Sequence, residues 1–180
     1  FPASDSSADF EAARAQSFAI TAKTTWTNTW WLDPVFLGAY PEDGLALFGS
    51  DLPEVRGGDL ELIHQPLDFL GTNVYQGLPV RAGPRGPEVV ALPTGYPITA
   101  FDWAVTPEAM QHTPRFFWDR YQKPIVITEN GISCRDWIMR DGKVHDPDRI
   151  DFIARHLVEL GRAVHHGVPV EAYFHWSFID

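Results

Sequence analysis

Three short apolar runs, separated by helix-like segments, constrain the fold of this chain most strongly. The runs lie at residues 67–75, 125–129 and 168–176. The first, bounded by proline and glycine, has the pattern of a strand buried on both faces. Amphipathic patterns with a proline in the first turn begin near Pro107 and Pro147, which predicts helices between the strands. This alternation indicates an α/β fold in which helices cover a parallel sheet.

The other segments add helices and a loop. Aromatic and alanine side chains recur every fourth residue from residue 18 to residue 30, which predicts one long helix over residues 7–33, ended by Asp33-Pro34. Residues 34–66 are predicted to form short helical pieces broken by glycine and proline. Residues 79–97, rich in proline and glycine, are predicted to form a long irregular loop.

The number of strands favours one architecture. Three strands are few for an open doubly wound domain, and no glycine-rich phosphate-binding motif is present. A (β/α)8 TIM barrel needs about 250 residues when whole. We therefore predict that residues 1–180 form a portion of a single TIM-barrel domain with no second domain.

Composition excludes several classes of function. Lys and Arg number 14 against 24 Asp and Glu, a net charge of −10, so no basic surface is available for nucleic acid. The sequence contains no uninterrupted run of about 18 apolar residues, the length needed to span a membrane. Because no targeting peptide is visible, a cytoplasmic location is predicted. The single Cys134 and the scattered histidines lack the spacing of a zinc site, and no metal is expected.

In a barrel, reactive groups stand where the strands end. Glu129 ends the second run and is either a catalytic carboxylate facing a cavity or a surface glutamate. Asn73 and Tyr75 end the first run, and Trp176 ends the third; turn-capping and core roles are the alternatives for them. Trp103 lies in a loop-like segment, where an indole could stack on a sugar ring.

The segment Ile127-Thr128-Glu129-Asn130-Gly131 resembles the nucleophile segment of glycoside hydrolase family 1, the β-glucosidase family. The similarity extends in order over nearly the whole chain. It includes segments similar to the family's helix after strand five, its sixth strand, its Trp-Glu-x-x-Pro-Glu segment, its insert after strand seven and its eighth strand; these are residues 30–34, 69–75, 103–108, 141–146 and 173–177.

The resemblance implies a retaining β-glycosidase that hydrolyses β-linked glucosides or related sugars by double displacement. Glu129 would be the nucleophile, and Tyr75 would orient it and keep it ionised. Asn73 would hold the sugar near its 2-hydroxyl, Trp176 would lie under the glycone, and Trp103 would form a wall of the aglycone side. No metal or organic cofactor is implied.

The resemblance also implies that the chain is incomplete. The family's acid/base glutamate lies in an Asn-Glu-Pro motif at the end of strand four, and this sequence has no such motif. The chain would begin just after strand five and stop in the loop after strand eight. We therefore expect the chain to be inactive alone and its partner to be the missing part of the barrel.

Three alternatives remain open. A 6-phospho-β-glycosidase would use the same nucleophile, and residues after Asp180 would distinguish it. A non-catalytic half-barrel that binds sugars or assembles with another protein would explain the missing acid glutamate. A nicked enzyme would complete its barrel with a separate chain, because three strands alone leave open edges.

Overall fold

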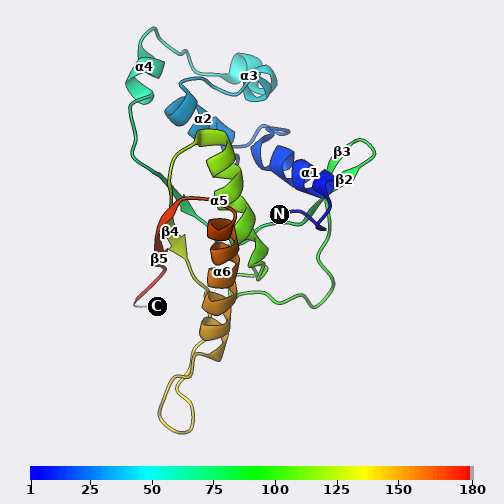
Figure 1. Cartoon of the computed structure of the whole chain (residues 1–180), viewed down its shortest axis with the longest axis vertical. Coiled ribbons are helices and arrows are strands. Elements are labelled where there is room, and N and C mark those ends of the chain that lie inside the picture. The colour runs from blue at the N-terminus through cyan, green and yellow to red at the C-terminus, as the bar shows by residue number, and fades with distance from the viewer. Residues whose placement is uncertain (179–180) are drawn as a thin grey trace. The chain divides into compact units, whose positions relative to one another are not determined.

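A computed structural model describes residues 1–178 (Figure 1). The described chain divides into two compact units. One contains Phe1, residues 69–79 and the described part of 89–180, and the other contains residues 2–68 and 80–88. The predicted stop of the chain in the loop after the last strand falls in part on residues 179–180, outside the described residues.

The first unit is built on a parallel sheet of the three predicted strands. The strands are β1 (Leu70–Asn73), β4 (Ile125–Asn130) and β5 (Val170–His175), and their order in the sheet is β1-β4-β5. Both pairs are parallel, as predicted. Because β4 is central, its first three residues are all buried. The carboxyl ends of all three strands therefore meet at one edge of the sheet.

Two long helices belong to the same unit and confirm the predicted strand–helix alternation. Helix α5 (Glu108–Tyr121) packs against α6 (Pro147–His165) and contacts β4. Phe116, Phe117 and Tyr121 lie on the buried face of α5. Helix α6 begins with Pro147 in its first turn, where the missing N–H costs nothing. Helix α5 thus packs on β4, and α6 follows the loop that begins at the end of β4.

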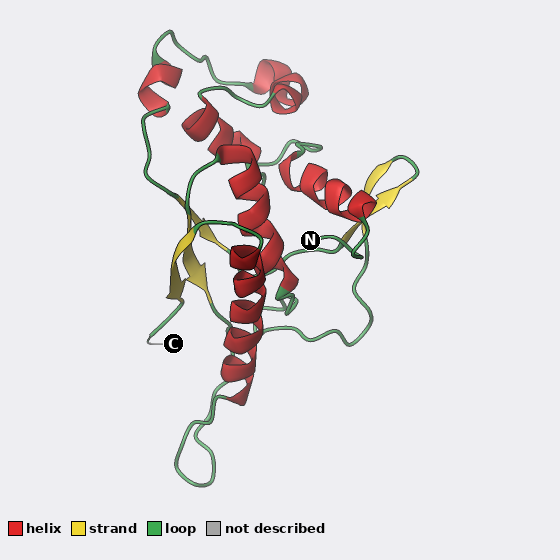
Figure 2. Cartoon of the chain, viewed as in Figure 1, coloured by secondary structure: helices red, strands yellow, loops and turns green. Residues whose placement is uncertain are grey.

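The second unit is mainly helical. It contains a β-hairpin packed on its first helix, seen as the separate pair of yellow arrows in Figure 2. Its elements are α1 (Ser7–Phe18), α2 (Thr29–Leu37), α3 (Glu42–Phe48), the 3₁₀ turn η1 (Gly49–Asp51), α4 (Asp59–Ile63), β2 (Val80–Gly83) and β3 (Gly86–Val89).

Two predictions for this part of the chain are wrong. The single helix over residues 7–33 is two helices, because the threonine-rich stretch of residues 19–28 favours extended backbone. Trp26, which belongs to the fourfold spacing on which that helix was predicted, is 93% exposed, and α2 continues through Pro34 to Leu37. The irregular loop predicted over 79–97 contains the hairpin β2–β3 instead.

The prediction that residues 67–75 are buried on both faces is also wrong. Strand β1 covers only Leu70–Asn73 and lies at an edge of the three-stranded sheet. Leu70 and Val74 are buried, whereas Phe69 is exposed, since an edge strand packs fewer neighbours than the central one. Among residues 1–178, none of the helices has the length and apolar character to cross a bilayer.

Candidate active site

The carboxyl edge of the sheet brings Glu129 and Tyr75 into contact. Glu129 is the penultimate residue of β4 and pairs in register with Asn73, the last residue of β1. Tyr75 follows two residues after Asn73. Its phenol donates a hydrogen bond to Oε2 of Glu129 over 2.7 Å, and the pair is partly buried. A hydrogen bond of this kind fixes the direction of the carboxylate.

Trp103 joins this pair through its ring. The indole meets the Tyr75 ring edge to face, with ring centroids 5.3 Å apart and an angle of 61° between the planes. A small turn holds Trp103 there: Ile98 and Ala104 form an antiparallel bridge, and the Thr99 N–H donates to the Trp103 carbonyl over 2.8 Å. The structure therefore places Trp103, Tyr75 and Glu129 in one connected group.

Asn73 connects to the site through the residue that precedes Glu129. The Thr128 hydroxyl donates a hydrogen bond to Oδ1 of Asn73 over 2.7 Å, and both side chains are exposed. This contact orients the amide of Asn73, so that its NH₂ group remains available as a donor to a sugar hydroxyl.

Trp176 connects to the site through the residue that follows Glu129. Its N–H donates to the carbonyl of Asn130 over 2.9 Å, directly after the end of β5. Its indole is 56% exposed, so it offers a wide apolar face for stacking. All five candidate residues thus lie on, or are attached to, the same edge of the sheet.

Sequence reasoning missed two residues here, Asn130 and Tyr173. The predicted apolar run stops at Glu129, whereas Asn130 ends β4 and is completely buried. Its Nδ2 donates to the Val74 carbonyl over 2.8 Å, and its Oδ1 accepts a hydrogen bond from the Tyr173 hydroxyl over 2.8 Å. The sequence signal that could have indicated a role for Asn130 is a polar amide placed directly at the end of an apolar strand.

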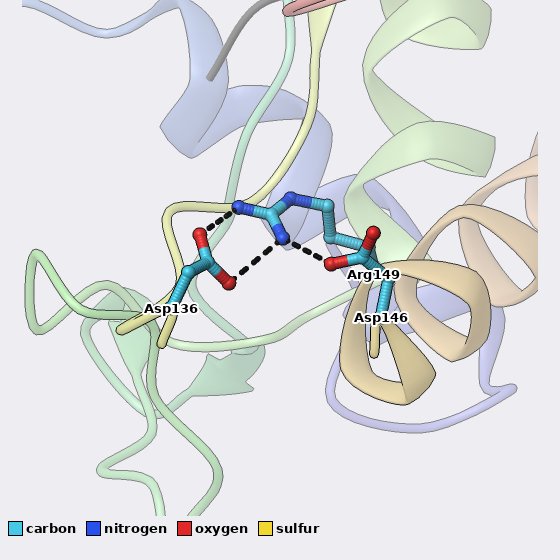
Figure 3. Close-up of polar contacts among 3 residues, drawn as sticks. All are labelled: Asp136, Asp146 and Arg149. Atoms are coloured by element: carbon cyan, nitrogen blue, oxygen red, sulfur yellow. Dashed lines mark hydrogen bonds and ion pairs between the residues drawn. The ribbon is translucent and has the colours of Figure 1, made fainter. Parts of the chain in front are cut away.

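The loop over residues 131–146 is anchored to α6 at its far end. Arg149, on the first turn of α6, holds Asp136 through two hydrogen bonds of 2.6 and 3.0 Å and Asp146 through one of 2.5 Å (Figure 3). The hydrogen bond from Arg149 holds the pKa of Asp136 below its ordinary value. Near its start, the loop is tied to the Trp103 segment, because the Ala100 N–H donates to the Ser133 carbonyl over 2.9 Å.

A cavity of about 870 Å³ opens between residues 96–108 and 132–155. It is lined by both polar and apolar side chains, but by none of the five candidate residues. The half-buried Cys134 is part of its wall, and partial burial raises the pKa of its thiol. This cavity therefore lies beside the Glu129 site rather than at it. Within residues 1–178, no cluster of three or more His, Cys, Asp or Glu side chains is arranged to hold a metal ion.

Comparisons with known proteins agree with this geometry. The family model described as glycosyl hydrolase family 1 matches residues 2–180. β-Glucosidase A of Thermotoga maritima is 36% identical over 151 residues, which is 83% of this chain and 34% of the relative. An aryl-phospho-β-D-glucosidase of Bacillus subtilis is 35% identical over 157 residues, 79% of this chain and 33% of the relative.

A solved structure matches at the level of the fold. The family 1 β-glucosidase from Thermotoga maritima in complex with isofagomine lactam superposes with a TM-score of 0.74 at 33% sequence identity. The match covers 98% of this chain and 39% of the other. This chain therefore spans less than two fifths of the length of these relatives.

Proposed function

Because the chain belongs to glycosyl hydrolase family 1, we propose that it supplies the nucleophile part of a retaining β-glycosidase. The observation that carries the proposal is the 2.7 Å hydrogen bond from Tyr75 to Glu129 at the carboxyl edge of the parallel sheet. In a TIM barrel, catalytic groups stand at that edge. The Tyr75 phenol orients the Glu129 carboxylate and is not itself consumed in the reaction.

The proposed mechanism has two steps. A carboxylate oxygen of Glu129 attacks the anomeric carbon, and the bond to the leaving oxygen breaks with its electron pair on that oxygen. An acid residue from outside this chain protonates it. Water then attacks the anomeric carbon and releases Glu129 as a carboxylate, while the same outside residue takes the proton. Two inversions give net retention of configuration.

The other candidate residues have binding roles in this proposal. The free NH₂ of Asn73 donates to the sugar near its 2-hydroxyl, where hydrogen bonds strengthen in the transition state. The exposed indole of Trp176 lies under the glycone. Trp103, which contacts Tyr75, forms a wall on the aglycone side. No cofactor takes part in this chemistry.

We also propose that the two units belong to one barrel domain. The rest of that barrel is formed by residues outside this sequence. Strands β1 and β5 are both edges of the sheet, and Phe69, Phe174 and Trp176 near them are exposed. Soluble proteins avoid such open edges and apolar faces. The other strands and the acid residue belong either to a longer polypeptide that includes this sequence or to a separate chain. The cytoplasmic location stays a prediction.

The substrate class is a β-glucoside or a related β-linked sugar. Support comes from the name of the Thermotoga relative and from its complex with a sugar-like lactam. A 6-phospho-β-glucoside is the second candidate, because the Bacillus relative is named for that activity and is 35% identical. Comparing turnover of aryl β-glucosides with that of their 6-phosphates distinguishes the two.

Replacing the nucleophile tests the proposal in the assembled enzyme. Glu129→Gly should lower kcat on an aryl β-glucoside by about 10⁴-fold or more. Added azide should restore turnover and give the α-glycosyl azide, because the anion attacks from the vacated side. Glu171→Gln, which changes an exposed glutamate on β5, is the matched control and should leave kcat unchanged. A β-glycosyl azide, or full activity of Glu129→Gly, would contradict the assignment.

A further inference from the structure

We infer that Asn130 is a positioning residue that holds Tyr75 against Glu129 by clamping the backbone between Asn73 and Tyr75. The inference rests on the proposed function, since it concerns the orientation of the proposed nucleophile. Within residues 1–178, the side chain of Asn130 bonds to Val74 and Tyr173 rather than to the Glu129 carboxylate, and it is completely buried. It acts through Val74 on one side and through β5 on the other.

The first part of the clamp lies on Val74. This residue is buried between Asn73 and Tyr75, and both of its backbone groups are bonded to the end of β4. Its N–H donates to the Glu129 carbonyl over 3.0 Å, and its carbonyl accepts from Asn130 Nδ2 over 2.8 Å. The peptide units on either side of Val74 are therefore fixed to Glu129 and Asn130, and Tyr75 follows directly.

The second part of the clamp lies on β5. Oδ1 of Asn130 accepts from the Tyr173 hydroxyl over 2.8 Å, and the carbonyl of Asn130 accepts from the Trp176 N–H over 2.9 Å. Burial raises the pKa of the Tyr173 phenol, so the hydroxyl remains protonated and able to donate. Asn130 thus joins the ends of β1, β4 and β5, the three strands whose ends carry Asn73, Tyr75, Glu129 and Trp176.

The clamp lies where the strand register becomes irregular. The register between β1 and β4 shifts between Thr72 and Asn73, and the register between β4 and β5 shifts between Ile127 and Asn130. The register of β4 is therefore irregular on both sides before its carboxyl end, where Asn73 pairs with Glu129 and His175 with Asn130. Because a buried amide with both ends bonded has no water to exchange with, the Asn130 side chain adds to the backbone hydrogen bonds that hold this edge.

Gly131 shows how closely the end of β4 is seated on β5. A Cβ added to Gly131 would lie 1.8 Å from the Trp176 carbonyl oxygen and 2.9 Å from the Trp176 carbonyl carbon. No side chain fits in that space. The Asn130-Gly131 pair therefore combines a side chain that bonds to the neighbouring strands with a residue that lets the backbones approach.

A double-mutant cycle in the assembled enzyme tests the inference. Asn130→Ala should lower kcat/KM for an aryl β-glucoside by about 10- to 100-fold, the effect of misplacing a reacting group by about 1 Å. In a Tyr75→Phe background, the same change should cost less than about 3-fold, because the residue that Asn130 positions no longer bonds to Glu129. Equal losses in both backgrounds would overturn the inference.

Two further variants protect the test against a folding artefact. Tyr173→Phe removes one bond of the clamp without leaving a cavity, and its smaller loss should show the same dependence on Tyr75. His156→Ala is the matched control, because His156 is equally buried but lies on α6, away from the site. It should lower the melting temperature and leave kcat unchanged. A loss of kcat that follows melting temperature in every variant would mean that Asn130 is only structural.

A crystal structure of the Asn130→Ala enzyme separates this inference from the proposed function. The inference predicts that the distance from the Tyr75 hydroxyl to the Glu129 carboxylate lengthens from 2.7 Å to beyond about 3.5 Å. An unchanged distance would refute it even if Glu129 is the nucleophile. If the wild-type enzyme cleaves no β-glycoside, the proposed function fails, and this distance still decides whether Asn130 positions Tyr75.

Discussion

Two polar clusters flank the loop from β4 to α6, and they differ in burial and charge. At its start, the fully buried Asn130 makes neutral hydrogen bonds to Val74 and Tyr173. At its end, Arg149 is 15% exposed and pairs with Asp136 and Asp146, whose side chains are 36% and 44% exposed. Water can replace the second set of partners but not the first. The hydrogen bonds of Asn130 therefore fix the position of the strand end, whereas the charged cluster around Arg149 only tethers the loop.

The largest expected effect is at the strand end, on catalysis. Tyr75→Phe removes the donor to Glu129 and should slow formation of the glycosyl-enzyme by roughly 10²-fold. Stopped-flow or single-turnover measurement with an activated glucoside gives this rate. Tyr40→Phe in the second unit is the control and should not change it. An unchanged rate for Tyr75→Phe would show that the contact does not orient the carboxylate.

A pair of glycine substitutions sharpens the comparison of packing. Gly131→Ala should destabilise the assembled enzyme by about 1–3 kcal/mol, because its Cβ meets the Trp176 backbone. Gly161→Ala, in α6, meets nothing within 4 Å and should stabilise by about 1 kcal/mol through helix propensity. Chemical denaturation measures both. The same sign for the two variants would count against the close seating of β4 on β5.

His156 extends the comparison, because it is a buried neutral group that pH can charge. Burial lowers its pKa, although its hydrogen bond to the Phe152 carbonyl opposes the shift. The histidine pKa is about 6.5 in the unfolded chain. As pH falls, the unfolded chain therefore takes up a proton before the folded chain does. Stability should be constant above that pH and fall below it. Melting temperatures from pH 8 to 5 should decline less steeply in His156→Leu; identical slopes would contradict this account.

The smallest effect is expected at the charged cluster. Arg149→Gln should lower the melting temperature by a few degrees at low salt and by less at high salt, because exposed ion pairs are screened. The value of kcat should change little, since Asp136 and Asp146, the residues that Arg149 holds, are not candidate site residues. A salt-independent loss, or a loss of activity as large as that of Tyr75→Phe, would show that the cluster positions the site after all.

The sequence predicted the helices and strands whose apolar residues follow a clear helical period or form a short apolar run. The three strands and helices α5 and α6 appear where prolines, glycines and apolar runs mark them. The helix over residues 7–33 was wrong because the fourfold spacing of aromatics continued across threonines that do not favour a helix. The hairpin β2–β3 was hidden because glycine-rich turns and irregular loops have similar composition.

The candidate site was predictable in outline for a different reason. Residues at strand ends converge in any parallel sheet, so Glu129, Tyr75 and Asn73 could be grouped before their contacts were known. The clamp of Asn130 was not predictable, because no local pattern says that an amide at a strand end will turn inward and find partners on two strands. Such contacts depend on packing that the sequence order does not display.

Covalent trapping tests the central claim most directly. The assembled enzyme is incubated with an activated 2-deoxy-2-fluoro-glucoside, its intact mass is measured, and the labelled peptide is sequenced. We predict a mass increase of one sugar residue, carried by Glu129. A label on any other residue, or no label on an enzyme that turns over β-glucosides, would contradict the assignment of Glu129 as the nucleophile.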